Sequence, residues 1–266
     1  MGFALHRPSS LEEAAHQIAG AEDGKFLAGG MTLLPTINQR LAAPSDLVDL
    51  STLPDMVGIA IGDGTLTIGA LTRHADVAGS PDVRSTLPAL ASLAGGIGDP
   101  QVRHRGTIGG SIANNDPAAD YPAAVLGLGA TVITNRREIP ADAYFLGLFE
   151  TALEADEIVT SVRFPVPSAA GYAKLKSPAS RFALVGVFVA RFADGVRVAV
   201  TGAGPCVFRV PDLEEALTAA FETHALDRLS IDSSGLNSDI HADADYRAHM
   251  VMVMAKRAVA SALAAR

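Results

Sequence analysis

Cysteine is almost absent from this chain of 266 residues, in which Cys206 is the only one. A single thiol cannot form an internal disulfide, a zinc site built on cysteines, or an iron–sulfur cluster that needs four thiolates. Any redox role of this chain therefore depends on another cofactor.

Positive charge and long apolar runs are also scarce. The chain has 21 Lys and Arg against 29 Asp and Glu, a formal net charge of −8, and no basic run, which argues against a nucleic-acid groove or an anionic membrane partner. The longest apolar stretch is residues 182–190, far short of the roughly 20 residues of a membrane span, and the N-terminus lacks a signal-peptide core. We expect a cytoplasmic protein with no membrane span.

A hydrophobic fraction of 48% indicates a globular chain, and its length allows about two domains at roughly 150 residues each. Ser10 and Glu13 form a capping box that predicts a helix. A strand at 25–28, a glycine turn and a helix containing Pro35 should follow. Asp63-Gly64 and Asp194-Gly195 each predict a hairpin. A capped helix is expected at Asp212 and Glu215, and residues 243–265 predict a long terminal helix.

The middle of the chain is rich in Gly, Asn and Asp. We expect helices at 72–79 and 83–94, and then a long loop from about residue 94 to 122, of the kind that is usually functional. Pro165 and Pro167 mark a plausible boundary, and the strands followed by helices beyond it predict a small α+β module from about residue 168.

Several motifs are too weak to define a site. The segment GAGPCV, residues 202–207, begins like a dinucleotide fingerprint but lacks the third glycine, so a strand-ending turn is the better interpretation. The seven histidines include no HExxH and no i, i+4 pair, which argues against a metal site formed by this chain. No GxSxG motif is present, and Cys206 has no histidine beside it, so no catalytic residue is assigned; partners distant in sequence remain possible.

Two glycine stretches remain, residues 28–32 and 107–111, which we call the first and second glycine loops. Either alone could be a tight turn that lets a helix pack close to a strand. Together they favour a diphosphate site, because an acidic chain can hold a diphosphate with bare backbone N–H groups. Thr32 and Ser111 would add hydroxyl donors, and Asp120 could accept from ribose hydroxyls.

The motifs AGGMTLLP, IGALTRHADVA, TIGGSIANNDPAADYP, YAKLKSPASRFALVGV and VTGAGPCVFR occur in this order. With them the chain resembles the flavoprotein (medium) subunit of the molybdenum hydroxylases. That family includes the medium subunit of aerobic carbon monoxide dehydrogenase and the FAD domain of xanthine dehydrogenase. The resemblance runs from about residue 3 to the C-terminus.

The resemblance implies an α+β fold in two parts. Residues 1–167 would form a two-subdomain FAD-binding module of the vanillyl-alcohol-oxidase/PCMH-like type, with subdomains at about 1–54 and 55–167. Residues 168–266 would form a C-terminal α+β domain of the carbon monoxide dehydrogenase flavoprotein type, with a three-stranded antiparallel sheet and a helix bundle.

The resemblance also implies the cofactor-binding residues. The two loops would surround the FAD diphosphate, Asp120 would meet a ribose hydroxyl, and Val159 would lie near the adenine. Lys174 would lie beside the cofactor, with Lys176 as the alternative if the register differs by two residues. The implied loop residues are Ala28, Gly29, Gly30, Met31 and Thr32 in the first loop, and Thr107, Ile108, Gly109, Gly110 and Ser111 in the second.

The chain departs from the family pattern at two places. Relatives often have His or a small polar residue at Met31, and many have Asp-Tyr where this chain has Arg181-Phe182. In the family that tyrosine can approach the flavin ring. Phe182 could keep the stacking surface without the hydroxyl, or it could be an ordinary core residue.

The implied function is electron transfer through FAD in a heterotrimeric molybdenum hydroxylase. A large partner subunit would hold the molybdenum cofactor and a small one the 2Fe-2S clusters, with a dimer of heterotrimers as the assembly. The acceptor could be a quinone, NAD or oxygen, and the substrate carbon monoxide, a purine, an aldehyde or an N-heterocycle. The alternatives are a structural or assembly subunit with a decayed flavin site, suggested by Met31 and Phe182, and a stand-alone flavin oxidase.

Overall fold

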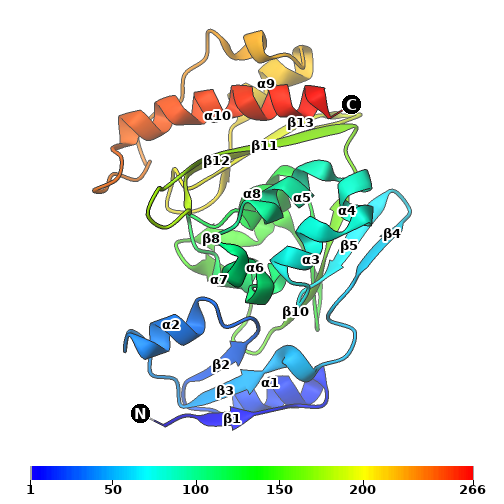
Figure 1. Cartoon of the computed structure of the whole chain (residues 1–266), viewed down its shortest axis with the longest axis vertical. Coiled ribbons are helices and arrows are strands. Elements are labelled where there is room, and N and C mark those ends of the chain that lie inside the picture. The colour runs from blue at the N-terminus through cyan, green and yellow to red at the C-terminus, as the bar shows by residue number, and fades with distance from the viewer. Residues whose placement is uncertain (1, 266) are drawn as a thin grey trace.

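The computed structural model describes residues 2–265, which form three tiers along the long axis of the molecule (Figure 1). The N-terminal tier is a parallel sheet in the order β1-β3-β2, with β1 at Ala4–His6, β2 at Gly24–Leu27 and β3 at Asp46–Asp49. Helix α1 (Leu11–Ala19) begins after Ser10, whose side chain accepts from the Glu13 N–H as expected. The first glycine loop leads from β2 into α2 (Leu33–Asn38).

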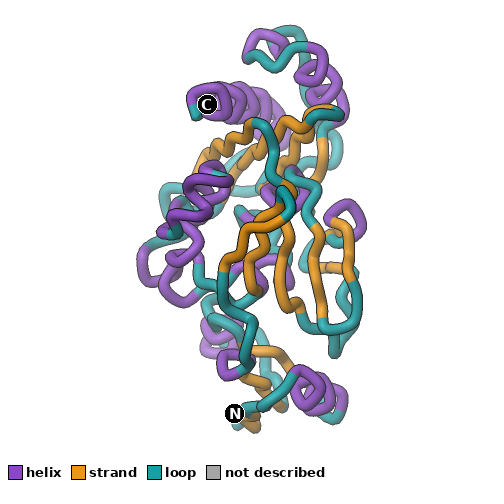
Figure 2. The backbone as a smooth tube through the Cα atoms, turned by 90° about the vertical axis from the view of Figure 1, so that its right-hand side faces the viewer, coloured by secondary structure: helices purple, strands orange, loops and turns teal. Residues whose placement is uncertain are grey.

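The middle tier is a five-stranded antiparallel sheet covered by short helices (Figure 2). Its order is β4-β5-β10-β6-β7, and the Asp63-Gly64 turn joins its first two strands as predicted. The strands are β4 (Ile59–Gly62), β5 (Thr65–Gly69), β6 (Thr131–Thr134), β7 (Glu138–Pro140) and β10 (Val159–Pro165). A small hairpin of β8 (Phe145–Gly147) and β9 (Glu150–Thr151) lies beside them, and 3₁₀ turns occupy Leu50–Thr52 and Ala141–Ala143.

The prediction of one long loop between residues 94 and 122 is wrong, because two helices form inside it. Helix α6 (Pro100–Arg105) begins at Asp99, whose side chain accepts from the Val102 N–H at 2.8 Å. Helix α7 (Ile108–Asn114) begins at Thr107 and ends at Asn115, which adopts the left-handed conformation with φ 44°. Side-chain capping stabilises these helices despite their glycine content.

The other helices of the middle tier are α3 (His74–Gly79), α4 (Pro81–Thr86), α5 (Pro88–Gly95) and α8 (Tyr121–Gly127). The single helix expected at 83–94 is two helices, since Pro88 cannot continue α4 and instead begins α5.

The C-terminal tier is an antiparallel sheet in the order β11-β12-β13-β14. Its strands are β11 (Ala169–Lys176), β12 (Ala183–Phe192), β13 (Gly195–Thr201) and the two-residue β14 (Phe208–Arg209), which is a short addition to the three expected strands. The long terminal helix predicted at 243–265 is α10 (Ala244–Ala264), which lies across the outer face of this sheet (Figure 1). A 3₁₀ turn occupies Thr223–Leu226. Helix α9 (Pro211–Ala219) follows Val210 without the side-chain cap expected from Asp212.

The two faces of the C-terminal sheet belong to different cores. Val185 and Val187 pack in one core with Val251 of α10, whereas Phe188 belongs to the core of the middle tier. Gly127 of α8 approaches Phe188 so closely that a Cβ there would lie 3.1 Å from its ring. The C-terminal sheet is therefore packed directly on the middle tier. Within residues 2–265, no helix combines the length and the apolar composition that crossing a membrane requires.

Candidate cofactor site

A cavity of about 480 Å³ lies between the tiers, a volume typical of ligand sites. Its lining includes residues of both glycine loops, Leu153 with residues 157–159, and the turn from Ser180 to Phe182 between β11 and β12. Among the residues implied by the family resemblance, the cavity brings together Ala28, Gly29, Gly30, Met31, Thr32, Thr107, Gly109, Gly110, Ser111, Asp120 and Val159. Ile108 instead lies fully buried in the core, and Lys174 reaches the site through Asp120.

The two glycine loops lie against each other although almost 80 residues separate them. A Cβ added to Gly29 would lie 2.1 Å from the Arg105 carbonyl oxygen, just before the second loop. A Cβ on Gly109 would lie 2.5 Å from the Cβ of Ala70. Gly30 has φ +73°, which favours glycine. The missing side chains thus allow a close approach of backbone segments.

The two loops differ in how many of their backbone N–H groups are free to donate to a ligand. Within residues 2–265, no hydrogen-bond acceptor is found for the N–H groups of residues 29–32. In the second loop the N–H of Ile108 donates to Thr72 and that of Gly109 to Ala70, at 3.2 and 2.8 Å. The N–H of Gly110 donates to the Thr107 hydroxyl at 3.2 Å. The expectation of bare N–H groups from both loops is therefore wrong for residues 108–111, whose N–H groups donate to Thr72, Ala70 and Thr107. Within residues 2–265, no acceptor is found for the N–H of Thr107.

Side-chain hydroxyls complement these donors. Thr32 and Ser111 both line the cavity, one from each loop. Gly110 also faces it, and a Cβ there would meet only the Thr107 hydroxyl at 3.0 Å and the Ala28 side chain at 3.6 Å. The second loop thus offers a small, open surface with the hydroxyls of Thr107 and Ser111.

Asp120 is a buried carboxylate at the cavity wall, with 4% of its surface exposed. The Tyr172 hydroxyl donates to its Oδ1 at 2.6 Å, and the Lys174 ammonium donates to its Oδ2 at 3.0 Å. Burial raises the pKa of Asp120, and the Lys174 charge and the two hydrogen bonds oppose that rise. A carboxylate has about four acceptor positions, so Asp120 retains capacity to accept from a ligand hydroxyl. Neither Lys174 nor Lys176 lines the cavity, but Lys176 is exposed whereas Lys174 bonds to the cavity residue Asp120.

The C-terminal sheet holds the backbone around Asp120. The Thr201 hydroxyl donates to the Ala119 carbonyl at 2.7 Å, and the Gly202 N–H donates to the Pro117 carbonyl at 2.8 Å. Gly202 itself has φ +82° directly after β13 and does not line the cavity, which confirms the strand-ending turn predicted for GAGPCV.

The two residues that depart from the family pattern both line the cavity. Met31 is 36% exposed and Phe182 is 46% exposed, so Phe182 is not a core residue. Arg181 before it has φ +64°, an uncommon conformation for a residue with a side chain.

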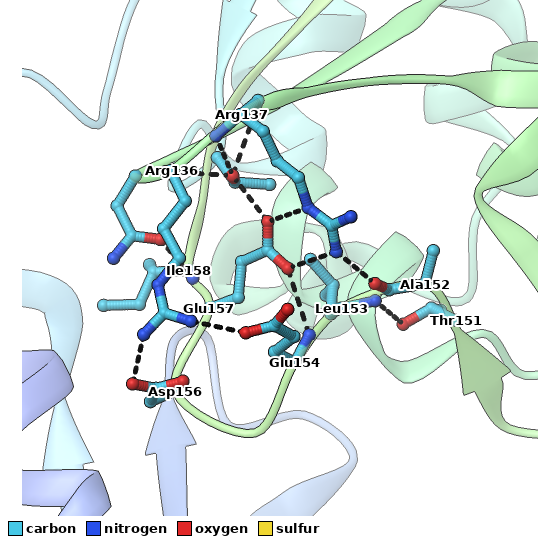
Figure 3. Close-up of polar contacts among 11 residues, drawn as sticks. Arg136, Arg137, Thr151, Ala152, Leu153, Glu154, Asp156, Glu157 and Ile158 are labelled. Carbon is cyan, nitrogen blue, oxygen red and sulfur yellow. Dashed lines mark hydrogen bonds and ion pairs between the residues drawn. The ribbon is translucent and has the colours of Figure 1, made fainter.

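Glu157 is a cavity residue that sequence reasoning missed (Figure 3). Its side chain is fully buried and accepts from the Nε and Nη2 atoms of Arg137, both at 2.9 Å. The Thr134 hydroxyl and the Glu154 N–H donate to it as well, at 2.8 and 3.0 Å. The bonds from Arg137, followed by the other donors, outweigh the burial penalty and lower the pKa of Glu157 to about 2. Glu157 therefore anchors the segment that carries Val159 to the cavity.

Replacing Arg137 by methionine should lower the free energy of unfolding by about 2 kcal/mol at pH 7, because Glu157 would keep its charge without its main donors. Arg137 is itself 46% exposed, which limits the effect. The folded-state pKa of Glu157 lies below its unfolded value of 4.5, so this stabilisation is present above pH 4.5 and is lost as the pH falls towards 2.

Urea denaturation at pH 7 and at pH 3 measures the Arg137 effect. Arg136→Met is the matched control, since Arg136 pairs with Glu154 and with the partly exposed Asp156 near the surface and should cost less than about 1 kcal/mol (Figure 3). Equal losses for the two variants, or a loss for Arg137→Met that grows as the pH falls, would contradict the role assigned to the pair.

Other cavity residues also lacked a usable sequence signal. His74, Ile97, Leu153 and Ile158 line the cavity. His74 lies within the motif IGALTRHADVA, but the histidine pattern of the sequence bears only on metal binding and does not predict a cofactor contact. Within the described residues, no cluster of three or more His, Cys, Asp or Glu side chains forms a candidate metal site.

The chain is similar to known proteins in both sequence and structure. A sequence model described as the FAD binding domain in molybdopterin dehydrogenase matches residues 1–167. The nicotine 6-hydroxylase medium subunit of Paenarthrobacter nicotinovorans is 35% identical over 96% of this chain and 95% of its own. The carbon monoxide dehydrogenase medium chain of Hydrogenophaga pseudoflava is 36% identical over 98% of this chain and 97% of its own. A solved carbon monoxide dehydrogenase of that organism, which lacks the Mo-pyranopterin moiety of its cofactor, superposes with a TM-score of 0.90 at 36% identity, covering 100% of this chain and 98% of that one.

Proposed function

This chain belongs to the family of FAD-binding domains in molybdopterin dehydrogenases and is an FAD-binding oxidoreductase subunit, and from that premise we propose that it transfers electrons from 2Fe-2S clusters of a partner subunit to an external acceptor. The observation that carries the proposal is the contact between two distant glycine loops at one cavity. Bound FAD supplies the redox chemistry, and the protein contributes binding, orientation and electrostatics.

The residues at the cavity fit an FAD molecule. The free N–H groups of residues 29–32 suit an anionic diphosphate, as do the hydroxyls of Thr32 and Ser111. Gly110 leaves room for its close approach. We assign the diphosphate to both glycine loops, a ribose hydroxyl to Asp120, and the adenine to the neighbourhood of Val159.

The remaining residues position these groups. Lys174 and Tyr172 keep Asp120 oriented, so that a hydroxyl donor meets a fixed acceptor. Phe182 offers an aromatic face at the cavity, without a hydroxyl that could bond to a ring. Asp120 and Lys174 are only 4% and 7% exposed, so little water reaches this end of the cavity.

The assembly we propose contains a large molybdenum-cofactor subunit and a small 2Fe-2S subunit, as a cytoplasmic dimer of heterotrimers. The names of the relatives as medium subunit and medium chain support partner subunits. The relatives are named for nicotine and for carbon monoxide, so we assign substrate choice to the partner chain.

The test is the flavin content of the purified complex. We expect about one FAD per chain, with oxidised-flavin absorption that dithionite bleaches and that turnover of the complex also reduces. Gly110→Glu should abolish this absorption, because its carboxylate would enter the diphosphate region.

The same purification separates the alternatives. A folded, fully assembled complex that stays colourless after FAD addition would contradict the proposal and favour a structural subunit. An active, solitary chain would favour a stand-alone flavin oxidase. Co-purification with a molybdenum-bearing and an iron–sulfur-bearing chain is the expected result.

A further inference from the structure

His74 is a buried histidine at the cofactor cavity that no motif assigned to a ligand. It is the first residue of α3, and only 5% of its surface is exposed. Its Nδ1 is enclosed and has no hydrogen-bond partner among residues 2–265. The other ring nitrogen, Nε2, makes no hydrogen bond within residues 2–265 either, and it is not enclosed, so a ligand in the cavity can reach it. Buried polar side chains in proteins nearly always have a partner, so an Nε2 without one at a cavity wall indicates a missing ligand.

The position of the ring depends on Gly106. A Cβ on Gly106 would lie 2.5 Å from Nε2 and 2.8 Å from Cδ2 of His74, so the ring occupies the space that a side chain would fill. Gly106 directly precedes the second glycine loop, and Arg105 before it contacts Gly29 of the first loop. The Nε2 edge therefore lies where the two loops meet.

The environment of the ring makes it neutral. Burial, followed by the positive charge of Arg103, lowers the pKa of His74 to about 4. The ring of Tyr121 packs 5.2 Å away, and its hydroxyl also lacks a partner among the described residues. Tyr121 does not line the cavity, so His74 is the member of this pair with access to a ligand. A neutral imidazole offers one N–H donor.

We propose that His74 is a further binding residue of this site, and that its Nε2–H donates to an oxygen of the cofactor diphosphate. The proposal rests on the proposed function, since it requires FAD in this cavity. His74 would supply a donor beside the second loop, where the N–H groups of residues 108–111 already have acceptors.

The test compares variants of the full chain freed of FAD, titrated with FAD and separately with ADP, which shares the adenine, the ribose and the diphosphate of FAD but lacks its flavin half. His74→Leu should weaken both ligands about tenfold to a hundredfold, as expected for a lost hydrogen bond to a charged group. His74→Gln should stay within about threefold of the wild type, because its amide N–H₂ can reach the position of Nε2. His104→Leu is the control, since His104 is an exposed histidine of α6 outside the cavity lining.

A second readout follows the ring itself. In ¹⁵N spectra of the histidine side chains, the signal missing from His74→Leu should shift when ADP binds to the wild type. An unchanged signal, or a His74→Leu variant that is less stable but binds both ligands normally, would overturn the assignment. Weaker FAD binding with normal ADP binding would place the contact on the flavin half and overturn it too. If the wild-type chain itself bound no FAD, the proposed function would be wrong. Failure of the proposed function can therefore be distinguished from failure of the His74 assignment.

Discussion

Gly29→Ala should weaken FAD binding by about 100-fold while leaving the chain folded. The added Cβ would lie 2.1 Å from the Arg105 carbonyl oxygen and 3.0 Å from the Cα of Gly106, whereas ordinary contact begins near 3.4 Å. Both obstructing atoms belong to the backbone, so no side chain can rotate away, and the two glycine loops must separate. Donors from the first loop and the hydroxyl of Ser111 could then no longer reach one diphosphate together.

Titration of the FAD-free chain measures this effect, and thermal unfolding checks that the variant is folded. Gly79→Ala is the matched control, because it also replaces a glycine by alanine but would meet nothing within 4 Å. It should bind FAD as the wild type does. If Gly29→Ala retained wild-type affinity, contact between the two loops would not be what forms the site.

The convergence of the two loops was predictable because an acidic chain with few local lysines must hold a diphosphate mainly with backbone N–H groups. Glycine-rich turns that precede helices are visible in sequence, and their joint presence favours one ligand over two unrelated turns. Sequence could not show which N–H groups remain free. That depends on Ala70 and Thr72, whose carbonyls accept from Gly109 and Ile108 through tertiary contacts.

Composition misled the secondary-structure prediction at the second loop. Glycine and asparagine have low helix propensity, so residues 94–122 were expected to be irregular. Asp99 and Thr107 nevertheless cap short helices, and packing of Ile108 and Ile112 in the core stabilises α7. Tertiary burial outweighed the local preference there.

Other site residues had no local signature at all. Glu157 becomes a site residue only because Arg137 lies on the neighbouring turn, 20 positions earlier, and no spacing rule connects the two. His74 depends in the same way on the missing side chain of Gly106. By contrast, the hairpins at Asp63-Gly64 and Asp194-Gly195 were predictable, since their turn chemistry is local.

Lys174→Met should destabilise the chain by about 3–5 kcal/mol at pH 7, the cost expected when one partner of a buried ion pair is removed. The side chains of Lys174 and Asp120 are only 7% and 4% exposed, so water cannot replace the ammonium. The variant also deprives the carbonyls of Gly96 and Arg181 of a donor, at 3.0 and 3.2 Å. Lys176→Met is the control on the same strand; Lys176 is exposed, and its loss should change stability by less than about 0.5 kcal/mol.

The pH dependence separates a charge effect from lost packing. Burial already raises the pKa of Asp120, and without Lys174 it should rise further. A group with a raised folded-state pKa favours folding most below its unfolded value, about 3.9, and loses that contribution as the pH rises through the folded value. Urea denaturation should therefore show the deficit of Lys174→Met shrinking from pH 7 to pH 4. The double variant Asp120→Asn with Lys174→Met buries no charge and should recover most of the stability at pH 7; a deficit that persists unchanged in it, or at pH 4, would show that Lys174 acts through packing instead.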